Sequence, residues 1–121
     1  MSTPRRLQLS RAKGWRLPAH AVTVARPGRW GNPFKVEVFG RERAIALFRA
    51  ALTGDWPGVE ALPEEMRVEA QAGYEGLRKK LGQDAVATVR ASLRGHDLAC
   101  WCRLNEACHA DVLLAIANSA E

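Results

Sequence analysis

The sequence predicts an α/β fold: a compact single domain in which a small, mainly parallel sheet is flanked by helices. The chain has 121 residues, about the length of one domain, and 47% of them are hydrophobic, which is enough to form a core. Short apolar segments alternate along it with longer segments of helical periodicity. Because parallel neighbouring strands need a crossover connection, this alternation favours a parallel sheet. We expect one domain over residues 1–121, with a basic N-terminal arm at about residues 1–19.

The first half of the chain is predicted to contain two strands and a helix. Residues 21–25 (AVTVA) are apolar and partly β-branched, as in a buried strand, and the loop RPGRWGNPF follows them directly. Residues 35–39 (KVEVF) alternate between polar and apolar and indicate a second short strand, ended by Gly40. The helix after it stops at Gly54 and has apolar residues at helical spacing, namely Ile45, Phe48 and Leu52.

The second half is predicted to contain three helices and one strand. Pro63 suits the first turn of a helix that ends at Gly82 and has one apolar face, formed by Met66, Ala70, Tyr74, Leu77 and Leu81. Asp84 can cap a short helix that stops at Gly95. We expect the apolar residues of this helix to face inward, namely Val86, Val89 and Leu93. A strand at residues 96–102 (HDLACWC) follows. The last helix, at residues 109–118, directs inward Val112, Leu113 and Ile116.

The expected strand pairing has a consequence for function. If the strands at residues 21–25 and 96–102 lie side by side and parallel, the loops RPGRWGNPF (26–34) and RLNEACHAD (103–111) leave the same edge of the sheet. Ligands of open α/β sheets bind at the carboxyl ends of the strands. We therefore expect these two loops to face each other across one cleft.

The charge distribution indicates an anionic partner. The 18 Lys and Arg exceed the 13 Asp and Glu, and the first 35 residues contain eight basic side chains and no acidic one. This asymmetry is typical of proteins that bind nucleic acid or a phosphorylated small molecule, although free use of arginine on a solvated surface gives it too. No apolar run is long enough for a membrane span, and no secretory signal follows the basic N-terminus. We expect no membrane association and a cytoplasmic location.

Four potential zinc ligands lie close together near the C-terminus: Cys100, Cys102, Cys108 and His109. The chain has three cysteines, and this odd number argues against a disulfide framework. Alternate residues of a strand point to the same face, which would bring Cys100 and Cys102 together. However, C-x-C spacing is unusual for zinc, and Cys108 and His109 diverge by about 100° at a helix start. A complete Cys₃His site is therefore expected to be strained, and a partial site that shares a ligand or a water is the other metal arrangement considered. We expect no cofactor, with zinc as the alternative.

A catalytic site is the second interpretation of this segment. Cys108, His109 and Asp111 lie at the start of the last helix, where the helix dipole stabilises a thiolate and free N–H groups bind anions. Together with Cys102 they are candidates for nucleophile, acid or base. For Cys100 we favour a core role, because free cysteines are often buried. Asp111 can equally be a plain carboxylate at a helix N-terminus.

The loop RPGRWGNPF supplies the candidate ligand-binding residues. Arg26 and Arg29 can hold a phosphate, and Trp30 can stack on a base. Gly31 permits close approach of the backbone, and Asn32 can donate and accept hydrogen bonds.

A second basic and aromatic segment, RAKGWR, lies in the N-terminal arm. Its candidate nucleic-acid-binding residues are Lys13, Trp15 and Arg16. A basic arm with one aromatic ring can bind single-stranded nucleic acid through phosphate contacts and stacking. The tryptophan can equally pack on the domain.

Three segments of the chain resemble successive signatures of one family: LQLSRAKGWRLP, VTVARPGRWGNPF and LACWCRLNEACHADVLLAIAN. It is the domain-of-unknown-function family numbered four-three-two-six, common in bacterial and phage genomes. Its members typically have KGWRxP, RPxxWGNPF and CWCxxxxxCHADVL motifs. The resemblance covers nearly the whole chain but implies no settled activity. Where the family usually has PLDQP between the cysteines, this chain has RLNEA. Asn105 thus replaces an aspartate, and Asp111 becomes the stronger candidate carboxylate.

We therefore expect a domain that binds a nucleotide, nucleoside or nucleic-acid base. Whether it is also an enzyme acting on a glycosidic bond or a base stays open. The alternative is a non-enzymatic, zinc-stabilised nucleic-acid-binding module, in which the cysteines are structural and the N-terminal arginines bind the nucleic acid. A third interpretation is an accessory protein that acts by contacting another protein. The sequence indicates neither the substrate nor the oligomeric state.

Overall fold

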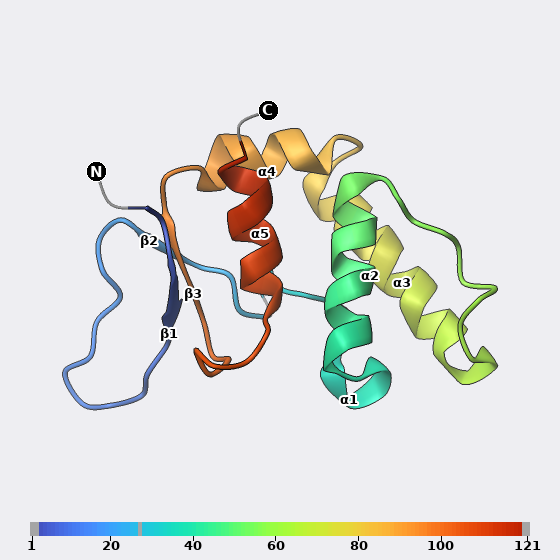
Figure 1. The fold of residues 1–121 in the computed structure, drawn as a ribbon, viewed down its shortest axis with the longest axis horizontal. Coiled ribbons are helices and arrows are strands. Elements are labelled where there is room, and N and C mark those ends of the chain that lie inside the picture. Colours follow the sequence, from blue (N-terminus) through green and yellow to red (C-terminus); the bar gives the residue numbers. More distant parts are fainter. Residues whose placement is uncertain (1–2, 27, 120–121) are drawn as a thin grey trace.

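The computed structural model describes residues 3–26 and 28–119, which form a small α/β domain (Figure 1). Its three strands are β1 (Arg6–Gln8), β2 (Ala21–Thr23) and β3 (Asp97–Cys100). Its five helices within the described residues are α1 (Val36–Phe39), α2 (Arg41–Thr53), α3 (Glu64–Leu81), α4 (Ala85–Leu93) and α5 (His109–Ala117). The predicted fold class is confirmed.

The sheet is entirely parallel, with β3 in the centre between β1 and β2. All four residues of β3 are buried, which explains why this strand is almost continuously apolar. The pairing continues past the strand ends, because Leu9 N donates to Cys100 O (2.9 Å) and Val24 N donates to Ala99 O (2.8 Å). The segments that follow all three strands therefore leave the sheet at one edge.

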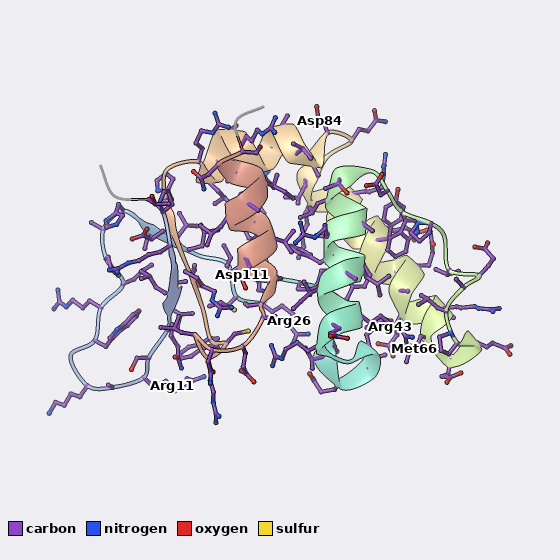
Figure 2. All side chains as sticks on the ribbon, in the orientation of Figure 1. Arg11, Arg26, Arg43, Met66, Asp84 and Asp111 are labelled. Carbon is purple, nitrogen blue, oxygen red and sulfur yellow. The ribbon has the colours of Figure 1, made fainter. Side chains whose placement is uncertain are left out.

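The helices stack outward from the sheet (Figure 1). Helix α5 packs against β3 and β1, α2 packs against α5, and α3 packs against α2, while α4 contacts all three of these helices. Figure 2 labels one contact between α2 and α3, in which Arg43 Nη1 lies 3.2 Å from Met66 Sδ. The core between these layers contains the inward residues predicted for the helices, including Phe48, Leu52, Val89, Leu93, Val112, Leu113 and Ile116.

The helix ends follow the predicted signals. The Asp84 carboxylate accepts a hydrogen bond of 3.0 Å from Ala87 N and so caps α4. Gly54 and Gly82 follow the last residues of α2 and α3 and have positive φ angles, which glycine adopts without strain.

The second predicted strand, at residues 35–39, is wrong. Residues Val36–Phe39 form the single helical turn α1, in which Phe39 N donates to Lys35 O and Gly40 N donates to Val36 O. This turn buries Phe39 with its ring edge-on to Phe34, the two ring centroids being 5.9 Å apart. An alternating pattern of five residues is too short to distinguish a strand from a helical turn. In the structure these residues form a helical turn, which buries the Phe39 side chain.

The strand β1 lies within residues 1–19, the segment described above only as a basic arm. Its three residues, Arg-Leu-Gln, carry one apolar side chain, so no strand pattern stands out. The strand forms because β3 has a free side: Leu98 N donates to Arg5 O at 3.0 Å. Residues 11–20 after it are all exposed. Among the residues that the structure describes, no helix is long and apolar enough to cross a membrane.

Candidate functional site

A pocket of about 250 Å³ opens at the carboxyl edge of the sheet, between the loops that follow β2 and β3. One wall comes from the loop after β2, through Arg26, Asn32 and Phe34. Arg41 of α2 and Trp101, directly after β3, contribute further wall residues. The cleft expected between the two loops is therefore present in the structure.

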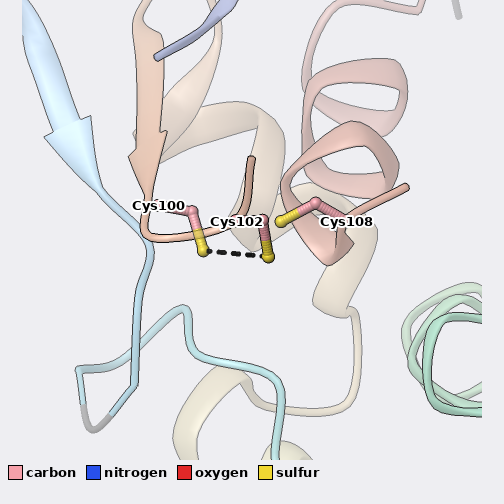
Figure 3. Close-up of side chains that lie close together, drawn as sticks. All are labelled: Cys100, Cys102 and Cys108. Atoms are coloured by element: carbon pink, nitrogen blue, oxygen red, sulfur yellow. Dashed lines mark hydrogen bonds between the residues drawn. The ribbon is translucent and has the colours of Figure 1, made fainter. Parts of the chain in front are cut away.

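The three cysteines form one cluster in the wall of this pocket (Figure 3). Cys100 ends β3, Cys102 follows it in the turn, and Cys108 immediately precedes α5. All three are free thiols, and their Sγ atoms lie within 4.8 Å of one another, with 3.8 Å between Cys100 and Cys102. The turn after β3 thus brings together cysteines that are up to eight positions apart in the sequence.

His109 joins the cluster to the opposite wall. Its Nε2 lies 2.7 Å from Val24 O, and because a carbonyl oxygen only accepts, Nε2 carries the proton. The other nitrogen, Nδ1, lies 3.6 Å from Cys108 Sγ and is free to accept from the thiol. Burial lowers the pKa of His109, so the imidazole is neutral near pH 7. Its ring edge also packs on Phe48, with 5.2 Å between the ring centroids.

The contact between Cys100 and Cys108 shifts the pKa values of the two thiols in opposite directions. The contact with Cys108 lowers the pKa of Cys100, and the same contact raises the pKa of Cys108. Cys100 is buried, in the core position that we favoured for it, and it also lines the pocket.

Arg6 of β1 holds the loop between Cys102 and Cys108. Its side chain is only 8% exposed, and Nη2 donates to the carbonyl oxygens of Arg103 (3.1 Å) and Leu104 (2.8 Å). Its Nη1 lies 3.2 Å from Asp111 Oδ2. A planar guanidinium with several fixed donors is suited to bridging such a loop.

Arg41, the first residue of α2, holds the same loop from the other side. Its Nη1 donates to Ala107 O at 2.9 Å and lies 3.8 Å from Cys102 Sγ, and its Nη2 lies 3.6 Å from Glu106 Oε2. The hydrogen bond to Cys102 raises the pKa of Arg41. A cation is therefore fixed beside the sulfur cluster and at the pocket wall.

The residues predicted in RPGRWGNPF separate into two groups. Arg26 and Asn32 line the pocket, whereas Arg29 and Trp30 do not. Trp30 is only 8% exposed and belongs to the core, and Arg29 lies over its ring at 5.1 Å from the centroid. The ring expected to stack on a ligand is instead part of the domain interior.

Asn32 and Gly31 shape the loop. The Asn32 amide donates to Ala44 O (3.2 Å) and accepts from Phe34 N (2.9 Å), which fastens the loop to α2. A Cβ at position 31 would lie 2.8 Å from Arg26 Cα, so the close approach that Gly31 permits is to its own loop.

Asp111 lies outside the pocket lining. Its carboxylate accepts from Cys108 N at 3.1 Å and pairs with Arg6. We considered Asp111 as a catalytic carboxylate or as a carboxylate at a helix N-terminus. In the structure it occupies the second position.

The basic segment after β1 lies beside the pocket. Lys13, Trp15 and Arg16 are all exposed, and Arg11 stacks over the ring of Trp101 at 4.6 Å from the centroid. Figure 2 labels Arg11 below the sheet, on the segment that follows β1. Trp101 is 45% exposed and lines the pocket, so it links this segment to the pocket.

Sequence reasoning missed Arg6, Arg41 and Trp101. Arg6 and Arg41 are distant from the cysteines in sequence, and nothing in their own surroundings marks them. Trp101 carried a signal, since an aromatic residue between two cysteines at a strand end lies at the ligand-binding edge of the sheet.

Fold and site together define a small α/β domain with a three-cysteine pocket at the carboxyl edge of its parallel sheet. The family model "Domain of unknown function (DUF4326)" matches residues 7–119. The chain therefore belongs to this family, which is the one that its sequence resembles. No curated protein and no solved structure matches the chain.

Proposed function

We propose that the pocket binds a nucleotide, either free or within a single strand. The observation that supports this proposal is that two loops and the first residue of α2 bring arginine and tryptophan side chains to one small pocket. Arg26 and Arg41 come to it directly, and Trp101 carries Arg11 on its exposed ring. Arginine fits phosphate oxygens, and an exposed indole ring fits the face of a base.

The size of the pocket limits the ligand. Drug-sized ligands occupy cavities of about 300–1,000 Å³. A volume of about 250 Å³ accommodates one ring-sized group, such as a single base, with its phosphate at the arginines. The walls are mixed in character, with Phe34 and Ile45 beside the thiols and the imidazole.

The exposed segment after β1 extends the binding surface to a longer ligand. Lys13 and Arg16 lie on the loop whose Arg11 stacks on Trp101. Phosphates on either side of a bound nucleotide would meet these cations. A single strand is thus expected to bind more tightly than a mononucleotide, with the larger salt dependence that extra phosphate contacts give.

Calorimetric titration of a panel of mononucleotides and short single-stranded oligonucleotides tests the proposal. Arg26→Ala is expected to weaken binding about tenfold or more, as loss of one charge-assisted phosphate contact does. Arg29→Ala is the matched control, because it removes the same charge from the same loop but outside the pocket lining. Equal losses in the two variants, or no binding to any member of the panel, would contradict the proposal.

Two further variants distinguish binding of a free mononucleotide from binding of a nucleotide within a single strand. Lys13→Ala with Arg16→Ala is expected to weaken oligonucleotide binding and to leave mononucleotide binding unchanged. Trp101→Ala is expected to weaken both. If oligonucleotides bind Trp101→Ala and Arg26→Ala as tightly as the wild type, the pocket is not the binding site. Chromatography of the same samples for free base checks whether the glycosidic bond is cleaved.

A further inference from the structure

We infer that Cys100, Cys102 and Cys108 bind one Zn²⁺ ion through three thiolates, with the fourth coordination position directed into the pocket. This inference does not depend on the proposed function, because metal binding is measured without any nucleotide. It also differs from the Cys₃His site considered from the sequence.

The sulfur positions match tetrahedral zinc. With Zn–S bonds of about 2.3 Å, neighbouring sulfur ligands lie roughly 3.8 Å apart. Cys100 and Cys102 have this separation, 3.8 Å, and all three Sγ atoms lie within 4.8 Å of one another. Figure 3 shows the three sulfur atoms close together, that of Cys108 coming from the start of α5 and the other two from the end of β3 and the turn after it.

His109 is not a member of this ligand set. Its imidazole does not lie within 4.8 Å of all three sulfur atoms, although Nδ1 is 3.6 Å from Cys108 Sγ. The Nε2 hydrogen bond to Val24 O fixes the ring in this position. Three protein ligands leave one position for water or for an atom of a bound molecule, as in catalytic zinc sites. Because all three cysteines line the pocket, that position faces it.

The surroundings suit a thiolate metal site. Three thiolates and Zn²⁺ carry a net charge of −1, and Arg41 Nη1 lies 3.8 Å from Cys102 Sγ to balance it. Cys108 precedes the N-terminus of α5, where the helix dipole stabilises a thiolate. Arg6 and Arg41 fix the loop between Cys102 and Cys108 through its carbonyl oxygens. Sulfur ligands select zinc over magnesium or calcium.

The test is titration of the reduced, metal-free full-length protein with Co²⁺, followed by Zn²⁺. We expect one Co²⁺ per chain, the strong visible bands of tetrahedral cobalt, and a thiolate-to-cobalt absorption whose intensity corresponds to three sulfur ligands. Zn²⁺ should then displace the cobalt. Absence of cobalt uptake by the reduced wild type, or bands typical of octahedral oxygen ligation, would overturn the inference.

Variants define the ligand set. Cys102→Ser, at the least buried of the three cysteines, is expected to lower the cobalt affinity by more than the roughly 10–100-fold cost of losing a second-shell partner. Glu106→Gln, on the same loop and paired with Arg41, is the control and should keep the wild-type affinity. His109→Phe should keep the full sulfur-to-cobalt absorption. Unchanged affinity in Cys102→Ser, or lost cobalt binding in a folded His109→Phe, would contradict three-sulfur ligation.

A measurement on the wild type guards against a variant that fails to fold. Alkylation of the reduced protein followed by mass spectrometry counts the reactive thiols. Because Cys100 and Cys108 are buried, the readout is the alkylation of Cys102: bound Zn²⁺ is expected to slow it, and a chelator should restore it. Equal alkylation with and without Zn²⁺ would contradict the inference.

Discussion

The Nε2 atom of His109 donates a hydrogen bond of 2.7 Å to the carbonyl oxygen of Val24. These two residues are 85 positions apart: Val24 directly follows β2, and His109, which lines the pocket, is the first residue of α5. The bond is buried and sets the tautomer that turns Nδ1 toward Cys108. The two walls of the pocket are thus joined by one defined contact.

Replacing this imidazole should destabilise the domain without unfolding it. His109→Phe keeps a ring against Phe48 but leaves the Val24 carbonyl without its buried donor, which costs about 1–3 kcal/mol. Urea unfolding followed by circular dichroism measures the loss. His96→Phe is the control, because the hydrogen bond from His96 to His20 O is exposed and its loss should cost less. Equal stability of wild type and His109→Phe would show that the bond contributes nothing.

Arg6 should be required for order in the loop that carries the cysteines. Arg6→Met retains most of the stem but removes the donors to Arg103 O and Leu104 O, and we expect a loss of about 1–3 kcal/mol. Hydrogen exchange should become faster over residues 103–107. Arg5→Met is the matched control, since it removes the same charge from an exposed neighbour whose backbone contacts are unaffected. Similar exchange rates in the two variants would contradict this role.

Two glycines of α3 should respond in opposite directions to alanine. At Gly73 an added Cβ would lie 2.8 Å from the ring of Phe34, a fully buried residue of the pocket wall, so Gly73→Ala should lower the melting temperature. At Gly76 no atom lies within 4 Å of the added Cβ, so Gly76→Ala should stabilise the helix by about 0.5–1 kcal/mol. Calorimetry distinguishes them. Stabilisation by both substitutions would mean that Phe34 can move aside.

Asp97 should make the free energy of unfolding decrease as the pH falls into the acid range. A hydrogen bond from Arg5 N and the contact with His20 lower the pKa of this carboxyl in the folded state. Its contribution is therefore present above the unfolded-state pKa of about 3.9 and is lost as the pH falls through the lower, folded-state pKa. Asp97→Asn should be less stable than wild type at pH 7, and the difference should shrink toward pH 3. A difference that stays constant with pH would contradict this account.

The layout of the fold could be predicted because each main element carries a strong local pattern. The apolar periodicity of α5 and the Asp84 cap of α4 both have the expected structural roles. The parallel pairing of β2 with β3 followed from the helices between them, and with it the position of the pocket.

Individual side chains at the site were harder to predict, since their roles depend on tertiary contacts. Trp30 stands in a polar, glycine-rich loop, yet the loop folds back so that its ring enters the core. Arg6 of β1 and Arg41 of α2 contact the loop between Cys102 and Cys108. Their partners, Arg103 and Ala107, are 97 and 66 positions away in the sequence, so no local pattern could predict these contacts. β1 depends on β3 for its formation and has no pattern of its own.

The most direct test of nucleotide binding at this pocket is a ¹⁵N–¹H NMR titration with a mononucleotide. The four tryptophan indoles serve as separate reporters, because only Trp101 lines the pocket. Our account predicts shifts of the Trp101 indole and of the Arg26, Cys102 and His109 amides. The indole of Trp56, stacked between Phe34 and Tyr74, should change little. Shifts confined to Trp15 and the segment after β1, with Trp101 unmoved, would contradict binding in the pocket.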